Sequence, residues 1–296
     1  MERPLVSIIT ITYNRADLIH RCIESIQHQT YPNYEHIIVD GNSPDDTQKV
    51  VESYNHPHIH YVKLDRRGPQ VQMRVGTDQA KGKYVTFLDD DDEYLPEKLE
   101  KQVNLFETLP DDIGVVYCWM TYYNFDNREK PIRIHKTELK GFVGDLTPSA
   151  SMISGTPTMM IRRSVFEEFG GTFDDSIGYI MSDWELLARI TQKYKVDYVP
   201  ESLVKVYVNH GHARLSAGFY QDKARRGILY HNHFLQTFSN VFDRYPERRL
   251  IHFEGLYNSN LILGNKKEAW HYYKLICKCK PSGTKRIKYL IKYLIK

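Results

Sequence analysis

The stretch that decides the fold is Tyr84-Val85-Thr86-Phe87-Leu88, followed at once by Asp89-Asp90-Asp91-Asp92. Its first five residues are apolar, aromatic or β-branched, and Gly82 precedes them, which is the pattern of a short buried strand. The four carboxylates that follow repel one another, and this repulsion grows beside a low-dielectric sheet. A hard divalent cation relieves it, because Mg²⁺ and Mn²⁺ prefer oxygen ligands and complete their shell with water and phosphate oxygens. The pattern predicts a metal and phosphate site at the carboxyl end of a central strand.

The acidic run also has a purely structural interpretation. Pro96-Glu97-Lys98-Leu99 has the pattern of a helix start, and acidic residues are favourable near a helix N-terminus. On this stretch alone, a solvated acidic turn and a metal site are equally good interpretations.

The composition is that of a globular protein. Of the 296 residues, 41% are hydrophobic and 26% are charged, and no apolar run reaches the ~18 residues that a membrane span needs. Met1-Glu2-Arg3-Pro4 leads directly into a strand pattern, so we expect no secretion signal and a cytoplasmic protein. The spacing of the four cysteines favours free thiols over disulfides or zinc; they are Cys22, Cys118, Cys277 and Cys279.

Strand and helix patterns alternate along residues 5–119. Apolar, β-branched runs cover 5–12, 35–40, 59–64, 84–88 and 113–119. Helical spacing covers 18–26, 46–54, 70–80 and 97–108. This alternation predicts an α/β fold with a Rossmann-like, mainly parallel sheet and helices on both faces.

The second half of the chain has weaker patterns. An edge strand is expected at 130–135, a loop at 141–155, short strands at 158–161, 196–199 and 203–208, and helices at 163–169 and 183–193. From 216 onward the pattern is helical. We therefore expect two parts, an α/β domain over 1–217 and a helical C-terminal extension over 218–296.

The positive charge is concentrated at the C-terminal end. The whole chain carries a net charge of +3, but residues 274–296 hold eight Lys and Arg residues and no acid, which leaves −5 for the rest. This asymmetry argues against nucleic-acid binding by the body of the protein and for a surface-binding tail.

Residues 285–296 have the pattern of one amphipathic helix. Its apolar face consists of Ile287, Leu290, Ile291, Leu294 and Ile295, with Lys and Arg residues around the other face and Tyr289 and Tyr293 at the boundary. A basic amphipathic helix suits peripheral contact with the inner face of an anionic membrane. The alternative is that the apolar face packs on the preceding helices.

Four stretches in register resemble family 2 glycosyltransferases, which have the GT-A nucleotide-sugar fold. They are Ser7 to Arg15 (SIITITYNR), Ile37 to Ser43 (IIVDGNS), Ala80 to Asp92, and Met160 to Ser164 followed by Ser182-Asp183-Trp184. The resemblance covers roughly residues 4–216. It implies inverting transfer of a sugar from a nucleoside-diphosphate sugar, most often a UDP-sugar, to a glycan or lipid-linked acceptor, with Mn²⁺ or Mg²⁺ as the cofactor.

The resemblance also implies roles for individual residues. The uracil-contacting Asp falls on Asp40, and the loop that packs on base and ribose falls on Thr12, Tyr13 and Asn14. The metal-binding D-x-D falls on Asp89 and Asp91, with Asp91 the preferred direct ligand and Asp90 placed to hold the ribose. The catalytic base falls on Asp183. A histidine near position 210 reaches the metal or diphosphate in related enzymes, which makes His210 a candidate ligand; a surface-loop histidine is the alternative.

Two positions depart from the family pattern. The Glu that precedes the catalytic Asp in the family is Ser182 here, so one acid of the pair is missing. The Arg of the family's Ala-Arg-Asn-x-Gly stretch is displaced by one residue, and its donor-holding role carries over to Arg74.

The chemistry of such a transfer fits these residue types. Negative charge develops on the leaving diphosphate, and a metal stabilises it as a Lewis acid. The acceptor hydroxyl must lose a proton, and a carboxylate in the first turn of a helix stays ionised to take it, which suits Asp183. An ordinary N-terminal acid is the alternative interpretation.

Two other functions compete with an enzyme of this family. A non-catalytic nucleotide-sugar-binding scaffold is consistent with Ser182 in place of Glu. A metal-dependent nucleotidyltransferase would require a glycine-rich phosphate loop after the first strand, and Thr12 to Arg15 contains no glycine.

Overall fold

The computed structural model describes residues 3–65, 68–151, 153, 155–170, 182–211, 220–279 and 283–295. The chain divides into two compact units. The first comprises Met1–Gly144, Met152–Phe173 and Leu186–His212, and the second comprises Asp145–Ser151, Asp174–Glu185 and Ala213–Lys296. The domain boundary expected between 217 and 218 lies outside the described residues.

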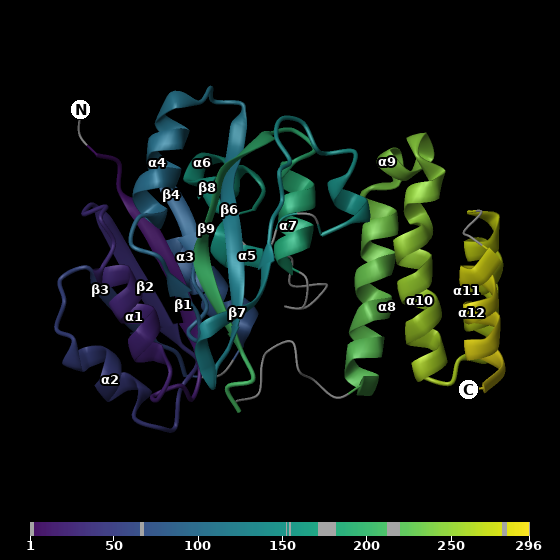
Figure 1. Ribbon diagram of the computed structural model, residues 1–296, viewed down its shortest axis with the longest axis horizontal. Helices are drawn as coiled ribbons and strands as arrows, with labels where there is room; N and C mark the ends of the chain where they lie inside the picture. Colours follow the sequence, from purple (N-terminus) through teal and green to yellow (C-terminus); the bar gives the residue numbers. More distant parts are fainter. Residues whose placement is uncertain are drawn as a thin grey trace. The chain divides into compact units, whose positions relative to one another are not determined.

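The first unit is built on one nine-stranded sheet (Figure 1). Its strands are β1 (Val6–Thr12), β2 (Tyr34–Asp40), β3 (Ile59–Lys63), β4 (Tyr84–Phe87), β5 (Glu93–Tyr94), β6 (Ile113–Asn124), β7 (Asn127–His135), β8 (Met160–Arg162) and β9 (Lys195–Val208). The strand order is β3-β2-β1-β4-β8-β6-β9-β5, with β7 paired to β6. The strands β1 to β4, β6 and β9 all run in the same direction, whereas β5, β7 and β8 run against them. The predicted α/β fold with a mainly parallel sheet is confirmed.

Helices cover both faces of this sheet. They are α1 (Ile19–Gln27), α2 (Thr47–Ser53), α3 (Pro69–Gln79), α4 (Lys98–Thr108), α5 (Gly155–Thr158) and α6 (Arg163–Glu168). The strands β1 and β2 are buried along their whole length, as strands covered on both sides must be. Alternate side chains of β1 divide between the faces: Ile8 packs in a cluster with α1 and α4, whereas Ile9 meets α3 at Gly76.

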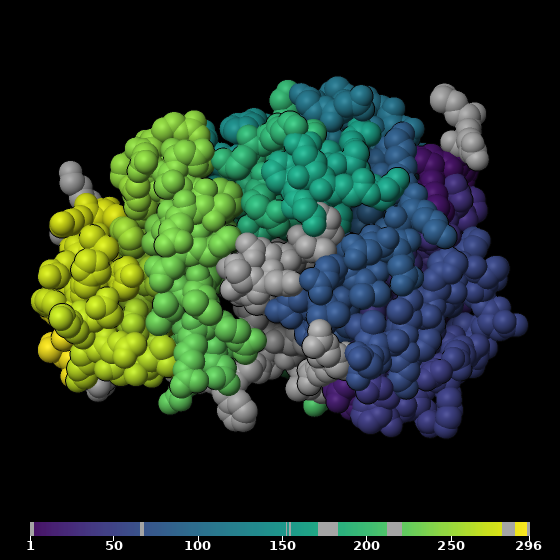
Figure 2. Space-filling model, turned by 180° about the vertical axis from the view of Figure 1, so that it is seen from behind, coloured from purple at the N-terminus to yellow at the C-terminus, as the bar shows by residue number. Residues whose placement is uncertain are grey.

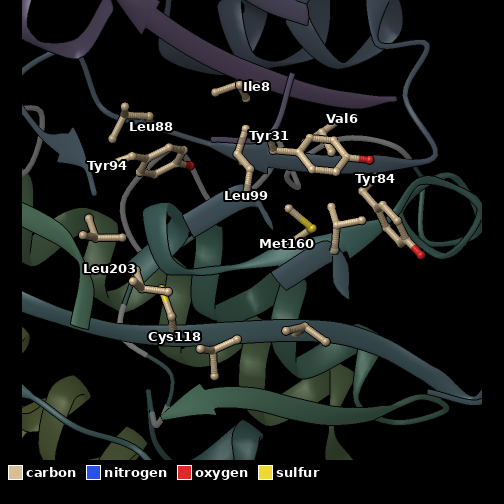
Figure 3. Close-up of a cluster of buried hydrophobic side chains, with 14 of the residues drawn as sticks. Val6, Ile8, Tyr31, Tyr84, Leu88, Tyr94, Leu99, Cys118, Met160 and Leu203 are labelled. Atoms are coloured by element: carbon tan, nitrogen blue, oxygen red, sulfur yellow. The ribbon is translucent and has the colours of Figure 1, made fainter. Parts of the chain in front are cut away.

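The main core lies between β1, β4 and β6 on one side and α1 and α4 on the other. Figure 3 shows this cluster, which gathers side chains from segments far apart in the chain, among them Tyr31, Tyr84, Leu99 and Met160. Every member is at most 8% exposed. The apolar residues that define the strand patterns in the sequence are the residues that fill this core.

One strand differs from its prediction. The two short runs expected at 196–199 and 203–208 form the single strand β9, which passes through Pro200. The register against β6 shifts there, with Cys118 opposite Val199 and Trp119 opposite Ser202. A proline that cannot donate a ladder hydrogen bond is accommodated at such a bulge, so the strand continues where the sequence pattern breaks.

The second unit is helical. Its helices are α8 (Tyr220–Thr237), α9 (Ser239–Arg244), α10 (Leu250–Ile262), α11 (Lys266–Lys278) and α12 (Gly283–Ile295), with short 3₁₀ turns at Thr147–Ser149 and Pro246–Arg249. The helix α7 (Ser182–Ile190) contributes its first turn to this unit. The predicted C-terminal helical extension is present. Within the part of the chain that the structure describes, no helix combines the length and apolar character that crossing a bilayer requires.

The core of the first unit contains a lysine that the sequence pattern does not single out. Lys98 is 0% exposed, its Nζ donates to Thr86 Oγ1 at 3.0 Å, and it lies 3.9 Å from the centre of the Tyr94 ring. It makes no ion pair among the described residues. Burial lowers the pKa of Lys98 from 10.5 to about 7, because the charged form loses its hydration.

We predict that Lys98→Met stabilises the protein by about 1–4 kcal/mol, since an apolar side chain of similar length removes the cost of burying an amine. The gain should shrink as pH rises from 7 to 10. In that window the unfolded chain keeps a proton that the folded chain has released, so the wild-type protein itself becomes more stable with rising pH. Chemical denaturation at several pH values checks this, with the exposed Lys49→Met as a control. A Met variant that is less stable than wild type at every pH would contradict the prediction.

Candidate functional site

Four strands of the first unit end at the same edge of the sheet. Since β1, β2, β4 and β9 run in the same direction, the residues that follow Thr12, Asp40, Phe87 and Val208 come out on one side. Three of these strand ends are followed by an asparagine in the left-handed region, with φ of 57° at Asn14, 66° at Asn42 and 65° at Asn209. Asparagine tolerates this conformation better than most residues, so the chain turns sharply after each strand. Crevices at this edge of α/β sheets bind ligands.

An acidic cluster, defined here as Asp89, Asp91 and Asp92, follows β4. One carboxylate oxygen from each residue can be chosen so that all lie within 4.8 Å of one another. His210, which follows β9, places its Nε2 2.8 Å from Asp91 Oδ2, and its side chain is buried. The structure therefore brings together the predicted ligands Asp89, Asp91 and His210. The carboxylate oxygens of this set fit Mn²⁺ or Mg²⁺, which prefer oxygen ligands.

Two arginines that the sequence analysis did not assign lie against these carboxylates. Arg15 Nε is 3.5 Å from Asp90 Oδ1. Arg21, on α1, donates to the backbone carbonyl of Asp91 at 3.4 Å, and its guanidinium lies over the rings of Phe125 and Tyr207. Arg15 is the last residue of the stretch Ser7 to Arg15, which includes β1 and resembles the family. Its place in that stretch is the only sequence pattern that marks it. Nothing in the helical pattern distinguishes Arg21, because its partners come from distant segments.

The arginines neutralise the carboxylates only in part. The pKa of Asp90 is raised to about 7, first by burial and then by the neighbouring Asp91 carboxylate, while Arg15 opposes the shift. Loss of hydration is therefore the main reason that the ionised form of Asp90 is disfavoured, and the Asp91 carboxylate adds to it. Added positive charge beside it would favour the ionised form.

Asp92 has a role that was not predicted. Its side chain is buried, and Oδ1 accepts a hydrogen bond from the backbone N–H of Tyr207 at 3.0 Å. This bond ties the turn after β4 to the end of β9, three residues before His210. Asp92 thereby helps to hold His210 beside Asp91.

The nucleoside-binding residues predicted from the resemblance lie at the ends of β1 and β2. The backbone N–H of Asn14 donates to Ser43 Oγ at 2.8 Å, so the loop carrying Thr12, Tyr13 and Asn14 is held against the turn after β2. Asp40 is 0% exposed and both of its oxygens are engaged, Oδ1 by Ser43 and Oδ2 by the Tyr61 hydroxyl at 2.5 Å. Asp40 thus connects the turn after β2 to Tyr61 of β3, and Ser43 connects that turn to the loop after β1.

The helix α3 contributes a residue that the resemblance did not point to. Gln72 Nε2 donates to the carbonyls of Thr12 at 2.8 Å and Val39 at 3.0 Å, which fixes the spacing of β1 and β2 at their carboxyl ends. Arg74, the predicted donor-holding residue, is exposed on the same helix.

Asp183 lies in the first turn of α7 and belongs to the second unit, whereas the acidic cluster belongs to the first. Its Oδ1 accepts the backbone N–H of Trp184 at 2.8 Å. Trp184 is buried among aromatic rings of α8 and α10, with Phe234 at 4.9 Å and a stacked His252 at 5.9 Å between ring centres, and its indole N–H donates to the Thr147 carbonyl. The start of α7 is therefore firmly anchored within this unit. The side chain of Ser182 and the whole of His212 lie outside the described residues.

Comparison with known proteins agrees with this architecture. The curated relatives include an uncharacterized glycosyltransferase of Rickettsia prowazekii, 31% identical over 207 residues, which are 68% of this chain and 63% of the relative. A GalNAc(5)-diNAcBac-PP-undecaprenol beta-1,3-glucosyltransferase of Campylobacter jejuni is 43% identical over 96 residues, 31% of either chain. The chain thus spans less than two thirds of the length of these relatives.

Solved structures share the fold at low sequence identity. Staphylococcus aureus TarS in complex with UDP-GlcNAc has a TM-score of 0.63 at 16% identity, covering 93% of this chain and 88% of the other. A mannosyltransferase of Pyrobaculum calidifontis in complex with GDP-Man and Mn²⁺ has a TM-score of 0.61 at 20% identity, covering 100% of this chain and 87% of the other.

The sequence of the first unit also matches a defined protein family over most of its length. Residues 7–170 match the family described as Glycosyl transferase family 2, and this stretch contains β1, β2, β4 and the acidic cluster. Together with the R. prowazekii relative, this match assigns the chain to glycosyltransferase family 2, a family of sugar-transferring enzymes.

Proposed function

We propose that the protein transfers a sugar, with inversion at the anomeric carbon, from a UDP-sugar to a hydroxyl of a glycan or lipid-linked acceptor. The observation that carries the proposal is the acidic cluster with His210, set at the carboxyl edge of a family 2 sheet. UDP-GlcNAc bound to TarS supports the nucleotide, and the undecaprenol-linked substrate in the name of the C. jejuni relative supports a lipid-linked acceptor.

In this proposal Asp91, Asp89 and His210 hold Mn²⁺ or Mg²⁺. When bound, such a cation supplies Lewis-acid stabilisation of the negative charge on the leaving diphosphate. Arg15 pairs with the Asp90 carboxylate, and Arg21 donates to the Asp91 backbone carbonyl, so both arginines help to hold the acidic run in place. Asp92 acts through the chain rather than on the substrate, because its bond to Tyr207 positions His210.

The nucleoside would bind against the loops that end β1 and β2. In this proposal Thr12, Tyr13 and Asn14 contact the base and ribose, Asp90 holds the ribose, and Arg74 holds the donor. A uracil that contacts Asp40 would replace the Tyr61 hydroxyl as the hydrogen-bond partner of Asp40 Oδ2. The other bonds of Asp40, from Ser43 to Oδ1, lie within the Asp40–Ser43 turn and would stay in place. Gln72 keeps the two loops at a fixed spacing while this exchange takes place.

Asp183 would take the proton from the acceptor hydroxyl. Its place in the first turn of α7 favours the ionised carboxylate, because the positive end of the helix dipole stabilises an anion. The rings packed around Trp184 hold that turn in one position, which a general base requires.

A panel of nucleotide sugars tests the proposed function directly. Release of the nucleoside diphosphate from each donor would be measured with Mn²⁺, with and without a lipid-linked glycan acceptor. We expect turnover with at least one UDP-sugar and a clear dependence on acceptor. Binding of UDP-sugars with no release from any donor would instead favour the non-catalytic scaffold.

The first prediction concerns the metal. UDP should bind with Mn²⁺ present and at least about tenfold more weakly with EDTA, because the diphosphate and the carboxylates repel each other without a cation. Asp91→Asn should weaken UDP binding in Mn²⁺ to a similar extent. Asp111→Asn, at a fully exposed aspartate of the same unit, is the matched control and should bind UDP normally. Equal UDP affinity in Mn²⁺ and in EDTA, measured by calorimetry, would show that UDP binding does not depend on a metal.

The second prediction concerns the base. Asp183→Asn should reduce kcat by roughly 10²-fold or more and leave UDP affinity nearly unchanged, since general-base catalysis contributes on that scale. Asp222→Asn is a suitable control, because Asp222 is also an acid in the first turn of a helix of the second unit. The two variants share the loss of a helix-dipole interaction and differ in the proposed role. Near-normal turnover by Asp183→Asn would assign proton removal to another residue.

A further inference from the structure

The last helix of the second unit packs through its tyrosines. Tyr289 and Tyr293 lie against a core cluster formed by α10 and α11, and the Tyr257 hydroxyl donates to the Tyr289 carbonyl. Lys292 also faces α10, where its Nζ donates to Asn258 Oδ1 at 2.5 Å. The side of α12 that packs against the other helices is therefore the one that carries Tyr289, Lys292 and Tyr293.

Two aliphatic residues of α12 face outward instead. Ile291 is 50% exposed and Leu294 is 71% exposed, although large aliphatic residues usually lie inside. For these two residues the structure departs from the alternative in which the apolar face packs on the preceding helices. Trp270 of α11 is also 38% exposed, and its ring lies 5.1 Å from that of Tyr293, the chain neighbour of Leu294. A half-exposed aromatic side chain of α11 thus lies against α12.

The same two helices also carry exposed cations. On α11, Lys267, Lys274 and Lys278 are exposed and share with Trp270 one stripe at helical spacing. On α12, Lys288 is exposed one turn before Ile291. We call this surface, made of Trp270, Ile291, Leu294 and the four lysines, the α11–α12 face; the helices that form it are yellow in Figure 2.

We propose that the α11–α12 face binds the surface of an anionic lipid bilayer. Aliphatic side chains, a tryptophan and flanking lysines on the same face are the combination that inserts into the boundary between headgroups and acyl chains. The lysines complement negatively charged headgroups, and the eight cations without an acid in residues 274–296 extend that attraction. A second copy of the chain is a poorer occupant, because a symmetric contact would bring the lysines of the two copies together.

The proposal is independent of catalysis, since it concerns a surface of the second unit and not the acidic cluster. If the protein had no transferase activity, the membrane proposal would be unaffected. If the protein did not bind membranes, the proposed transferase function would be unaffected. If both hold, a lipid-linked acceptor and the enzyme would meet at the same membrane surface.

Co-sedimentation of the full chain with vesicles tests the proposal. One set of vesicles contains phosphatidylcholine and phosphatidylglycerol in equal amounts, and the other contains phosphatidylcholine alone. We expect the wild-type chain to sediment with the anionic vesicles at low salt, to be released as salt is added, and to bind the neutral vesicles weakly.

The variant Ile291→Gln/Leu294→Gln should reduce partitioning onto anionic vesicles by about tenfold or more, since it removes most of the apolar insertion. Leu229→Gln is the matched control, because Leu229 is a 58% exposed leucine of α8 in the same unit, outside the α11–α12 face. Lys274→Glu/Lys278→Glu should reduce binding to anionic vesicles only. All substituted residues are exposed, so unchanged thermal melts should accompany these effects.

Three results would overturn the proposal. The wild-type chain could stay in the supernatant with anionic vesicles at low salt. The Ile291→Gln/Leu294→Gln variant could sediment as wild type does. Light scattering could show a wild-type dimer that this variant converts to a monomer, which would make the face an interface between copies.

Discussion

Repulsion among the carboxylates that follow β4 is the constraint on which the α/β unit depends. Four consecutive aspartates leave a buried strand, and two of them, Asp90 and Asp92, are themselves buried. The groups that offset this repulsion come from three other segments. Arg15, from the loop after β1, pairs with Asp90, and Arg21, from α1, donates to the Asp91 carbonyl. From β9 and its end, the Tyr207 N–H donates to Asp92 and His210 contacts Asp91. The relative positions of these segments are thus fixed by electrostatics as well as by core packing.

Burial of Asp90 adds to the cost of this repulsion. Burial and, to a smaller extent, the Asp91 carboxylate raise the pKa of the Asp90 carboxyl to about 7, and Arg15 opposes the shift. Carboxylates in such surroundings are costly for structure alone. Their presence at the edge where six co-directional strands end is understandable if a cation and a diphosphate bind there, as proposed.

How far the sequence predicts this protein depends on the range of the interactions involved. The strands β1, β2 and β4 were predictable because each is a continuous apolar run. The family resemblance marks Asp89, Asp91 and His210, which the structure brings close together, and their role as ligands stays a prediction. Arg21 and Gln72 were not predictable, because their partners lie in distant segments and no local pattern marks them.

Other features depended on details of packing. The buried Lys98 looked like an ordinary first-turn residue of α4, and only the fold places it against Tyr94 and Thr86. The single strand β9 was hidden by Pro200, which a bulge accommodates. The amphipathic character of the last helix was readable from its spacing, but which side faces the core was decided by the tyrosines that fit between α10 and α11.

The central claim is that the acidic cluster holds a cation that in turn holds a diphosphate. Electron paramagnetic resonance of Mn²⁺ measures this most directly, because the six-line signal of free Mn²⁺ disappears when the ion is bound by protein. With the protein present, adding UDP should remove the free signal at Mn²⁺ concentrations where adding uridine does not, and Asp91→Asn should abolish the difference. An equal free Mn²⁺ signal with UDP and with uridine, in a protein that binds both, would contradict the account.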